Sequence, residues 1–191
     1  MHETIVELLA DLGIQPEYTN ATLQNLGAAD SKYLRDLKLN VKAVLTSEHL
    51  SAKETHLLAL ATATNNNKEI LVNAFAAKAK THGATEAEIA ETQACASLLA
   101  ANNVFYRFRH FVEKDAYNNA PARLRMNIMM NPALGKEFFE LISLAVSAVN
   151  GCEMCVKSHE QSVLQNGGTE SRIWDAIRNT SIITSLGKVI Y

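Results

Sequence analysis

The sequence has no excess of basic residues and no long uninterrupted apolar run. Its 18 Lys and Arg residues are balanced by 20 Asp and Glu residues, so the formal net charge is −2 at pH 7. Proteins that bind nucleic acid or anionic membranes carry an excess of positive charge, so we expect neither kind of partner. The apolar run over residues 141–149 is interrupted by Ser143 and Ser147 and is too short to span a bilayer.

Cysteine is also scarce: the chain has three, and two of them form a single C-x-x-C motif. Three cysteines cannot form the disulfide framework of a small secreted protein. Residues 1–9 are acidic and helix-like, without the basic flank and apolar stretch of a signal peptide. We therefore expect a cytoplasmic protein, in which a C-x-x-C pair is more often catalytic or metal-binding than structural. Cys95, in an Ala- and Leu-rich segment, is predicted to be a buried core residue.

Sustained alternation of apolar and polar residues, the pattern of a half-buried strand, is absent. Apolar residues instead recur at three- and four-residue spacing, and hydrophobic residues make up 48% of the 191 residues, enough for a core. We predict a single all-α domain over residues 1–191. Its helices are predicted over residues 2–12, 30–39, 53–65, 67–82, 85–102, 121–130, 135–149, 152–166 and 169–187.

Glycine and threonine mark two of the predicted helix boundaries. Gly83 and Gly167 are expected to end helices, and Thr85 and Thr169 to cap the helices that follow. In the last helix, Trp174 has isoleucines near it at helical spacing and is predicted to lie in the core.

The segment that is richest in reactive groups covers residues 150–159, Asn-Gly-Cys-Glu-Met-Cys-Val-Lys-Ser-His. If a helix begins just after the Asn-Gly break, Cys152 and Cys155 lie about one turn apart at its amino end. There, free N–H groups and the helix dipole favour a thiolate. His159 follows Cys155 at i+4, on the same face. Glu140 lies on the preceding helix and reaches this group only if the turn folds the two helices against each other.

Such a dithiol can reduce a peroxide. One thiolate attacks the O–O bond and becomes a sulfenic acid, and the second sulfur then condenses with it to form a disulfide. An unperturbed thiol has a pKa of about 8.5, so the attack near neutral pH needs a base. We expect His159 to remove the proton and Glu140 to orient the imidazole or relay the proton.

Zinc binding and a purely structural role remain alternatives for the cysteine pair. Cys-x-x-Cys-x-x-x-His, with Glu140 as a fourth ligand, is similar to part of a zinc site, although zinc sites usually draw their ligands from two separated pairs. A c-type haem attachment is excluded because Val156, not histidine, follows the second cysteine.

The sequence repeats itself at an offset of 84 residues, so that residues 83–86, Gly-Ala-Thr-Glu, correspond to residues 167–170, Gly-Gly-Thr-Glu. Roughly nine identical positions occur over about 33 ungapped residues. We predict two related helical units, a degenerate one over about residues 53–103 and an active one over about residues 137–187. A chance likeness between alanine-rich helices is the alternative. The positions that match Glu140, Cys152, Cys155 and His159 are His56, Lys68, Leu71 and Phe75, so only the second unit can carry thiol chemistry.

Residues 102–111, Asn-Asn-Val-Phe-Tyr-Arg-Phe-Arg-His-Phe, interleave aromatic and basic side chains. Such a pattern can bind single-stranded nucleic acid, but this run is isolated in a mildly acidic protein. We predict instead a subunit interface or a wall of the active-site pocket, because aromatic and Arg side chains favour interfaces.

With these residues, the chain resembles the alkyl hydroperoxidase D (AhpD) family, within the wider carboxymuconolactone decarboxylase-like group. The family-like stretches are residues 36–40, 102–111, 124–128 and 139–160, and together they span nearly the whole chain. The resemblance implies an all-helical fold with a duplicated core, assembled as a homotrimer. We expect no bound cofactor and no metal.

The resemblance also implies a lipoyl-dependent alkyl hydroperoxide reductase that acts in antioxidant defence and serves an AhpC-type peroxiredoxin. Dihydrolipoamide, as the lipoyl group of a dihydrolipoamide acyltransferase, would supply the electrons. On the matching positions, Cys155 is the thiol that passes through sulfenic acid, Cys152 is the proton donor and disulfide partner, and His159 and Glu140 form the proton relay. Some family members carry a histidine where this chain has Met154, so proton transfer from that position is missing here.

Two other functions stay open. The first is a dithiol–disulfide carrier that reduces a partner protein and has little peroxidase activity of its own. The second is a zinc-bound or purely structural helical oligomer. Decarboxylase chemistry is a weaker option, because it needs no paired thiols and leaves Cys152 and Cys155 unexplained.

Overall fold

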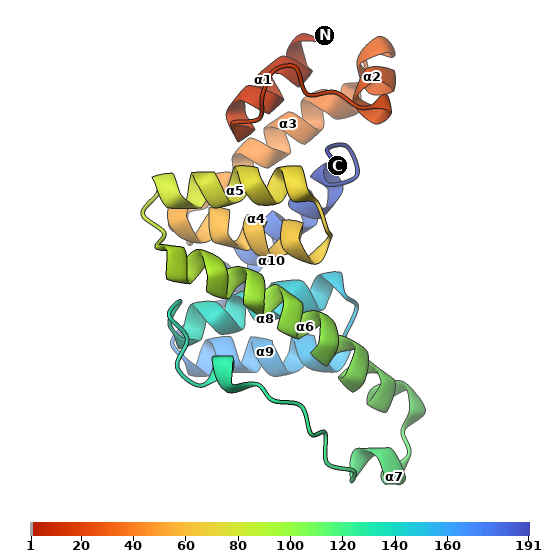
Figure 1. Ribbon diagram of the computed structural model, residues 1–191, viewed down its shortest axis with the longest axis vertical. Coiled ribbons are helices and arrows are strands. Elements are labelled where there is room, and N and C mark those ends of the chain that lie inside the picture. Colours follow the sequence, from red (N-terminus) through yellow and green to blue (C-terminus); the bar gives the residue numbers. More distant parts are fainter. Residues whose placement is uncertain (1) are drawn as a thin grey trace.

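The computed structural model describes residues 2–191 and shows an elongated, helical protein (Figure 1). Within these residues it contains ten α-helices, one 3-10 turn and no strand, which confirms the predicted fold class. The elements are α1 (Glu3–Leu12), α2 (Ala21–Ala28), α3 (Lys32–Leu45), α4 (Ala52–Asn65), α5 (Glu69–Thr81), α6 (Glu86–Val112), α7 (Asp115–Asn118), the 3-10 turn η1 (Asn127–Met129), α8 (Lys136–Val149), α9 (Glu153–Gln165) and α10 (Glu170–Leu186). No helix in this described part of the chain is both long and apolar enough to cross a membrane.

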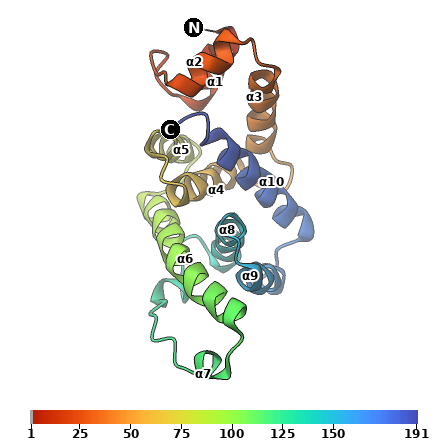
Figure 2. The same cartoon turned by 90° about the vertical axis from the view of Figure 1, so that its right-hand side faces the viewer.

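The helices are stacked along the long axis of the molecule. Helices α1–α3 form one end, and the extended arm that carries α7 forms the other (Figure 1). Between these ends lie two helical hairpins, α4 with α5 and α8 with α9. Helices α6 and α10 each pack against both hairpins and hold them together (Figure 2).

The two hairpins follow the repeat seen in the sequence. Helices α4 and α8 begin 84 residues apart, as do α5 with α9 and α6 with α10. The side chains of Thr85 and Thr169 cap α6 and α10 as predicted. Gly83 and Gly167 precede these caps with φ values of 88° and 91°, a left-handed conformation that favours glycine. The two related helical units expected from the sequence are therefore present.

The core is centred on the first helix of each hairpin. In α4 every residue from Thr55 to Ala63 is buried, and in α8 every residue from Phe138 to Ser147 is buried. A helix whose side chains are buried on all sides needs neighbours on all sides. Figure 2 shows α8 enclosed by α6, α9 and α10, so side chains on α8 can meet three other helices inside the protein.

The predicted helix over residues 121–130 is wrong, and the predicted end of the preceding helix is too early. Only Asn127–Met129 form a 3-10 turn, within a segment whose side chains are mostly exposed or half-buried. A short helix without a buried face is marginal in water, which explains its absence. Helix α6 continues past residue 102 to Val112, because Asn102 and Asn103 are buried there instead of ending the helix.

Two further differences from the sequence-based predictions concern Trp174 and helix α2. Trp174 is 68% exposed instead of lying in the core. The buried positions of α10 begin with Asp175 and Ala176 and recur at helical spacing through Asn179 and Ile183, so Trp174 lies beside the buried stripe. Helix α2 was not predicted, and it buries only Leu23.

Arg172 links the two helical units. Its guanidinium on α10 donates to Glu54 of α4 at 2.6 Å, to both carboxylate oxygens of Glu137 of α8 at 3.0 and 3.1 Å, and to the backbone carbonyl of His49 at 2.8 Å. Burial of Glu54 raises its pKa, but the hydrogen bonds from Arg172 and Ser51 outweigh this and hold the pKa below its usual value.

We expect Arg172→Ala to lower the free energy of unfolding at pH 7 by about 1–3 kcal/mol, because two carboxylates lose a charged hydrogen-bond donor. The pKa of Glu54 is lower in the folded than in the unfolded chain. Its contribution is therefore present above the unfolded value, about 4.3, and is lost as the pH falls through the folded value. Urea unfolding from pH 7 to pH 3 measures both effects. Arg178→Ala, which removes an exposed guanidinium from the same helix, is the control and should change stability much less. Equal losses in the two variants would contradict the assignment.

Candidate functional site

The turn between α8 and α9 places both cysteines of the C-x-x-C motif at the amino end of α9. Gly151 has a φ of 67°, which allows the tight turn, and the Cys152 N–H donates to the Ser147 carbonyl at 3.1 Å. Helix α9 begins at Glu153, so Cys152 is its N-cap residue and Cys155 lies in the first turn. The helix thus starts where the sequence predicts, and its free N–H groups and dipole favour a thiolate when the pair is reduced.

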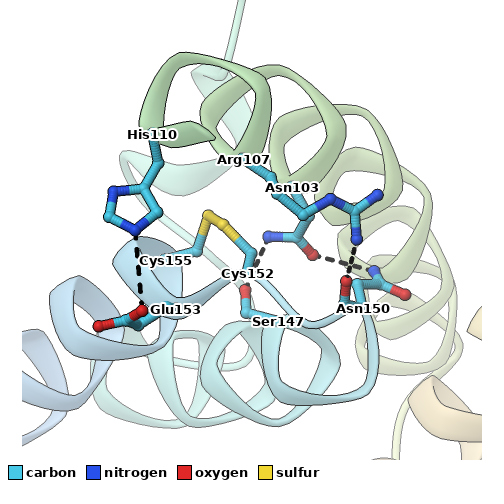
Figure 3. The surroundings of a disulfide bond; sticks show 8 residues. All are labelled: Asn103, Arg107, His110, Ser147, Asn150, Cys152, Glu153 and Cys155. Carbon is cyan, nitrogen blue, oxygen red and sulfur yellow. Dashed lines mark hydrogen bonds and ion pairs between the residues drawn. A yellow bond between two sulfur atoms is a disulfide. The ribbon is translucent and has the colours of Figure 1, made fainter. Parts of the chain in front are cut away.

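Cys152 and Cys155 are joined by a disulfide, with their Cα atoms 5.3 Å apart (Figure 3). The two sulfur-bearing residues differ in access. Cys152 is 1% exposed, whereas Cys155 is 7% exposed and lines a cavity of about 380 Å³. Cys155 is therefore the residue of the pair that an incoming small molecule meets.

Glu140 and His159 meet between α8 and α9. The His159 Nδ1 lies 2.6 Å from one Glu140 oxygen, and Lys136 Nζ lies 2.7 Å from the other. Glu140 is buried, and burial raises its pKa, but the hydrogen bonds from His159 and Lys136 outweigh burial and hold the pKa below its usual value. The sequence-based condition that the turn folds the two helices against each other is therefore met.

The ionised carboxylate fixes the hydrogen atoms on the imidazole. An ionised Glu140 can only accept, so His159 Nδ1 must carry the hydrogen and donate it. In the neutral imidazole, Nε2 then has a free lone pair. Because His159 lines the same cavity as Cys155, this nitrogen is suited to take up a proton and return it.

The cavity, which we call the site cavity, is formed between α6, the segment around η1 and α9. Its lining is mainly apolar, with three methionine side chains. It is lined by Leu99, Asn102, Asn103, Tyr106, Met126, Met129, Met154, Cys155, Ser158 and His159. Three of these residues belong to the run over residues 102–111, so that run supplies a wall of the pocket, one of its two predicted roles.

The comparison with known proteins fits this geometry. The chain matches the carboxymuconolactone decarboxylase family over residues 32–114 and again over residues 115–188. The chain belongs to the carboxymuconolactone decarboxylase family. Its two matches cover the two helical units in turn, and helices α1 and α2 lie before the first match.

Relatives within the carboxymuconolactone decarboxylase family carry the name that the sequence resemblance indicated. The alkyl hydroperoxide reductase AhpD of Anaeromyxobacter dehalogenans (strain 2CP-C) is 44% identical over 163 residues, which cover 85% of this chain and 87% of the relative. The alkyl hydroperoxide reductase AhpD of Coxiella burnetii (strain Dugway 5J108-111) is 38% identical over 160 residues, covering 82% of this chain and 90% of the relative. The resemblance to the AhpD group is thereby confirmed.

In this family member, the first helical unit holds no counterpart of the reactive group. His56 and Phe75 occupy the positions of Glu140 and His159, and their rings lie together with centroids 6.5 Å apart. Leu71, which matches Cys155, is fully buried. The first unit therefore keeps the packing of the site without its chemistry.

A chain of hydrogen bonds holds the α8–α9 turn in place (Figure 3). Asn103 Nδ2 donates to Ser147 Oγ at 2.9 Å, and Asn150 Nδ2 donates to Asn103 Oδ1 at 2.9 Å. Asn150 also exchanges hydrogen bonds with Asn65 at 3.0 and 3.1 Å, and Arg107 donates to the Asn150 carbonyl. The turn that precedes Cys152 is thus fixed by α4 and α6.

Across residues 2–191, no group of three or more His, Cys, Asp or Glu side chains is placed to hold a metal ion.

Some cavity residues were not identified from the sequence. Leu99 and Ser158 could have been found, because they lie three residues from Asn102 and Cys155 on the same helix faces. Met126 and Met129 carry no such signal, because they lie outside the α-helices, just before and within the short 3-10 turn η1.

Cys95 is expected to be inert in the folded protein. It is fully buried, its Sγ lies 3.5 Å from Ser143 Oγ, and burial raises its pKa to about 12. We expect iodoacetamide at pH 8 to label reduced Cys155 first, and to reach Cys95 only in denaturant. Peptide mass spectrometry after timed labelling measures the order. Labelling of Cys95 in the folded protein as fast as Cys155 would show that the thiol is accessible.

Proposed function

We propose that this protein is an alkyl hydroperoxide reductase that uses the Cys152–Cys155 dithiol. One observation carries the proposal: Cys155, which is disulfide-bonded to Cys152, lines the same cavity as His159. The His159 imidazole is in turn hydrogen-bonded to the buried carboxylate of Glu140. The names of the AhpD relatives support the same reaction. Decarboxylation, the reaction that the family name describes, needs no paired thiols and would leave Cys152 and Cys155 without a chemical role.

The first step is attack on the peroxide. His159 takes the proton of the Cys155 thiol, and the thiolate attacks the terminal oxygen of R–O–O–H. A sulfur–oxygen bond forms, the O–O bond breaks, and Cys155 becomes a sulfenic acid while the alkoxide leaves. The Cys152 thiol gives its proton to the alkoxide, so the organic product is the alcohol.

The second step closes the disulfide. The Cys152 thiolate attacks the sulfur of the Cys155 sulfenic acid, and hydroxide leaves. The proton held by His159 converts the hydroxide to water. One peroxide has then been reduced to an alcohol and water at the expense of two thiols, and the protein is in the disulfide form that the structure contains.

A dihydrolipoyl group suits the regeneration of the dithiol. Both cysteines are almost completely buried, so a reductant has to enter the site cavity with its thiols at the tip of a slender arm. A lipoyl group on a dihydrolipoamide acyltransferase has this form. The apolar lining, including Met154 between the cysteines, favours its hydrocarbon chain. We place this cycle in the reducing environment of the cytoplasm.

The proposal also includes a protein partner: an AhpC-type peroxiredoxin, with which this protein would act in antioxidant defence. Because Cys155 is buried, such a partner has to present its own cystine on a segment narrow enough to enter the cavity. The alternative function, a dithiol–disulfide carrier that reduces a partner protein and has little peroxidase activity of its own, uses the same cysteine pair; the apolar cavity beside Cys155 favours a small hydroperoxide as substrate.

We further propose that the protein is a homotrimer. Large apolar side chains are exposed on the outer end of α6 and on α7, at Val104, Phe108, Phe111 and Tyr117, and exposed apolar groups of this kind mark assembly surfaces. Light scattering should give three times the mass of one chain. We expect Phe111→Glu to lower that mass, because a charge would be buried in the interface. A monomeric mass for the unaltered protein would contradict the assembly.

The peroxidase proposal predicts distinct effects for the four site residues. With dihydrolipoamide and cumene hydroperoxide, Cys155→Ser and Cys152→Ser should abolish turnover. His159→Gln and Glu140→Gln should lower it by about 100-fold or more, because both disturb proton transfer to and from the thiol. Peroxide loss measures the rate, and mass spectrometry follows the Cys152–Cys155 redox state.

Matched controls come from the first helical unit and from the third cysteine. His56→Gln changes the position that corresponds to Glu140, and Cys95→Ser removes the thiol outside the pair; both should keep turnover per folded molecule. Full activity in His159→Gln and Glu140→Gln would contradict their roles. A pair that cycles between dithiol and disulfide without consuming peroxide would instead establish the carrier.

A further inference from the structure

The amide of Asn102 contains an unpaired acceptor within the site. Asn102 is 6% exposed, and its Oδ1 is buried with no hydrogen-bond partner among the residues that the structure describes. A buried acceptor without a partner costs free energy, so native proteins keep few of them. Three other buried side-chain atoms in residues 2–191 share this state, on Thr64, Arg109 and Asn179, but none of these residues lines the site cavity.

The position of Asn102 puts this acceptor beside the reactive group. Leu99, Asn102 and Tyr106 are spaced three and four residues apart on α6 and line the site cavity together with Cys155 and His159 of α9. Asn102 Nδ2 lies 3.1 Å from the Met126 sulfur, and this contact holds the amide in place.

Met126 covers the amide with a movable side chain. It belongs to the non-helical segment before η1 and lines the same cavity. Methionine is unbranched and has three rotatable side-chain bonds, so a molecule that enters the cavity can displace it at low cost. Displacement of Met126 releases Asn102 Nδ2, so the amide can rotate and present Oδ1 to the cavity.

We propose that Asn102 Oδ1 accepts a hydrogen bond from the terminal O–H of the hydroperoxide and so holds the O–O bond at Cys155. The inference rests on the proposed function and adds a substrate-binding residue to it. An alkyl hydroperoxide has a single hydrogen-bond donor, the O–H of its terminal oxygen. The unpaired amide oxygen is an acceptor and therefore matches this donor, while the methionine and leucine side chains contact the alkyl group.

The hydrogen bond acts on the oxygen that is transferred. The Cys155 thiolate attacks the same terminal oxygen, which keeps its hydrogen and becomes the sulfenic acid, while the alkoxide leaves and receives the Cys152 proton. Asn102 neither gives nor takes a proton in this step. Its contribution is the orientation of the O–O bond toward the sulfur.

Asn102→Leu tests the proposal, because leucine has a similar shape and no acceptor. The reduced protein is mixed with cumene hydroperoxide in a rapid-quench experiment, and oxidation of the dithiol is followed by mass spectrometry. We expect the rate to fall about 5- to 30-fold, the effect of one lost hydrogen bond to the substrate. The melting temperature should not fall, because an unpaired buried oxygen has been removed.

Two further reactions separate substrate binding from a structural role. Methyl methanethiosulfonate has no O–H or N–H to donate, so its rate with Cys155 in a Cys152→Ser background should be unchanged by Asn102→Leu. Reduction of the disulfide by dihydrolipoamide should also be unchanged. Thr64→Val is the matched control: it removes an unpaired buried oxygen outside the site cavity and should leave all three rates unchanged.

Each other result overturns the inference. An unchanged rate with cumene hydroperoxide shows that the amide does not touch the peroxide. Equal losses with hydroperoxide and methanethiosulfonate show that Asn102 only shapes the site. A loss confined to dihydrolipoamide shows that the amide binds the reductant. If the unaltered protein does not react with cumene hydroperoxide at all, the proposed function itself fails, and the inference fails with it.

Discussion

The site depends on the need to pair the polar residues of α8, a helix buried among other helices. Glu137, Glu140, Ser143 and Ser147 lie three or four residues apart along it and reach three neighbours. Glu137 binds Arg172 of α10, Glu140 binds His159 of α9, and Ser143 and Ser147 contact Cys95 and Asn103 of α6. A buried polar group without a partner is costly, so each contact constrains how its neighbour packs. The same stripe that holds the helices together also supplies the carboxylate of the site.

The first helical unit keeps the helical arrangement but lacks the row of polar residues that α8 carries. At the positions of Glu137, Glu140, Ser143 and Ser147, helix α4 has Lys53, His56, Ala59 and Ala63. Lys53 still pairs with a neighbouring helix, through Glu88 of α6, and the two alanines are buried without needing partners. The backbone can therefore repeat while the chemistry does not, because packing constrains shape whereas the reactive group needs particular atoms.

Sequence patterns predicted the parts of the structure that depend on local signals. Helical spacing, the threonine caps and the offset of 84 residues predicted the all-helical fold and its two units. The spacing of Cys152, Cys155 and His159 predicted two cysteines at the amino end of α9 and a histidine on the same face of that helix. Trp174 and the segment over residues 121–130 were predicted wrongly, because packing against other helices, and not the local pattern, decides which face is buried. The sequence did not predict the unpaired oxygen of Asn102 either, because tertiary packing determines which polar atoms find partners.

The unequal burial of the two sulfur-bearing residues determines the regiochemistry of exchange at this disulfide. An incoming thiolate approaches from the site cavity and meets Cys155, while Cys152 is enclosed by the α8–α9 turn. In the proposed cycle, the mixed disulfide therefore forms on Cys155, and Cys152 departs as a thiolate at the amino end of α9. Attack by Cys152 on this mixed disulfide only restores the original disulfide, so net reduction needs the second thiol of the incoming dithiol, which attacks its own sulfur in the mixed disulfide and releases the Cys155 thiolate.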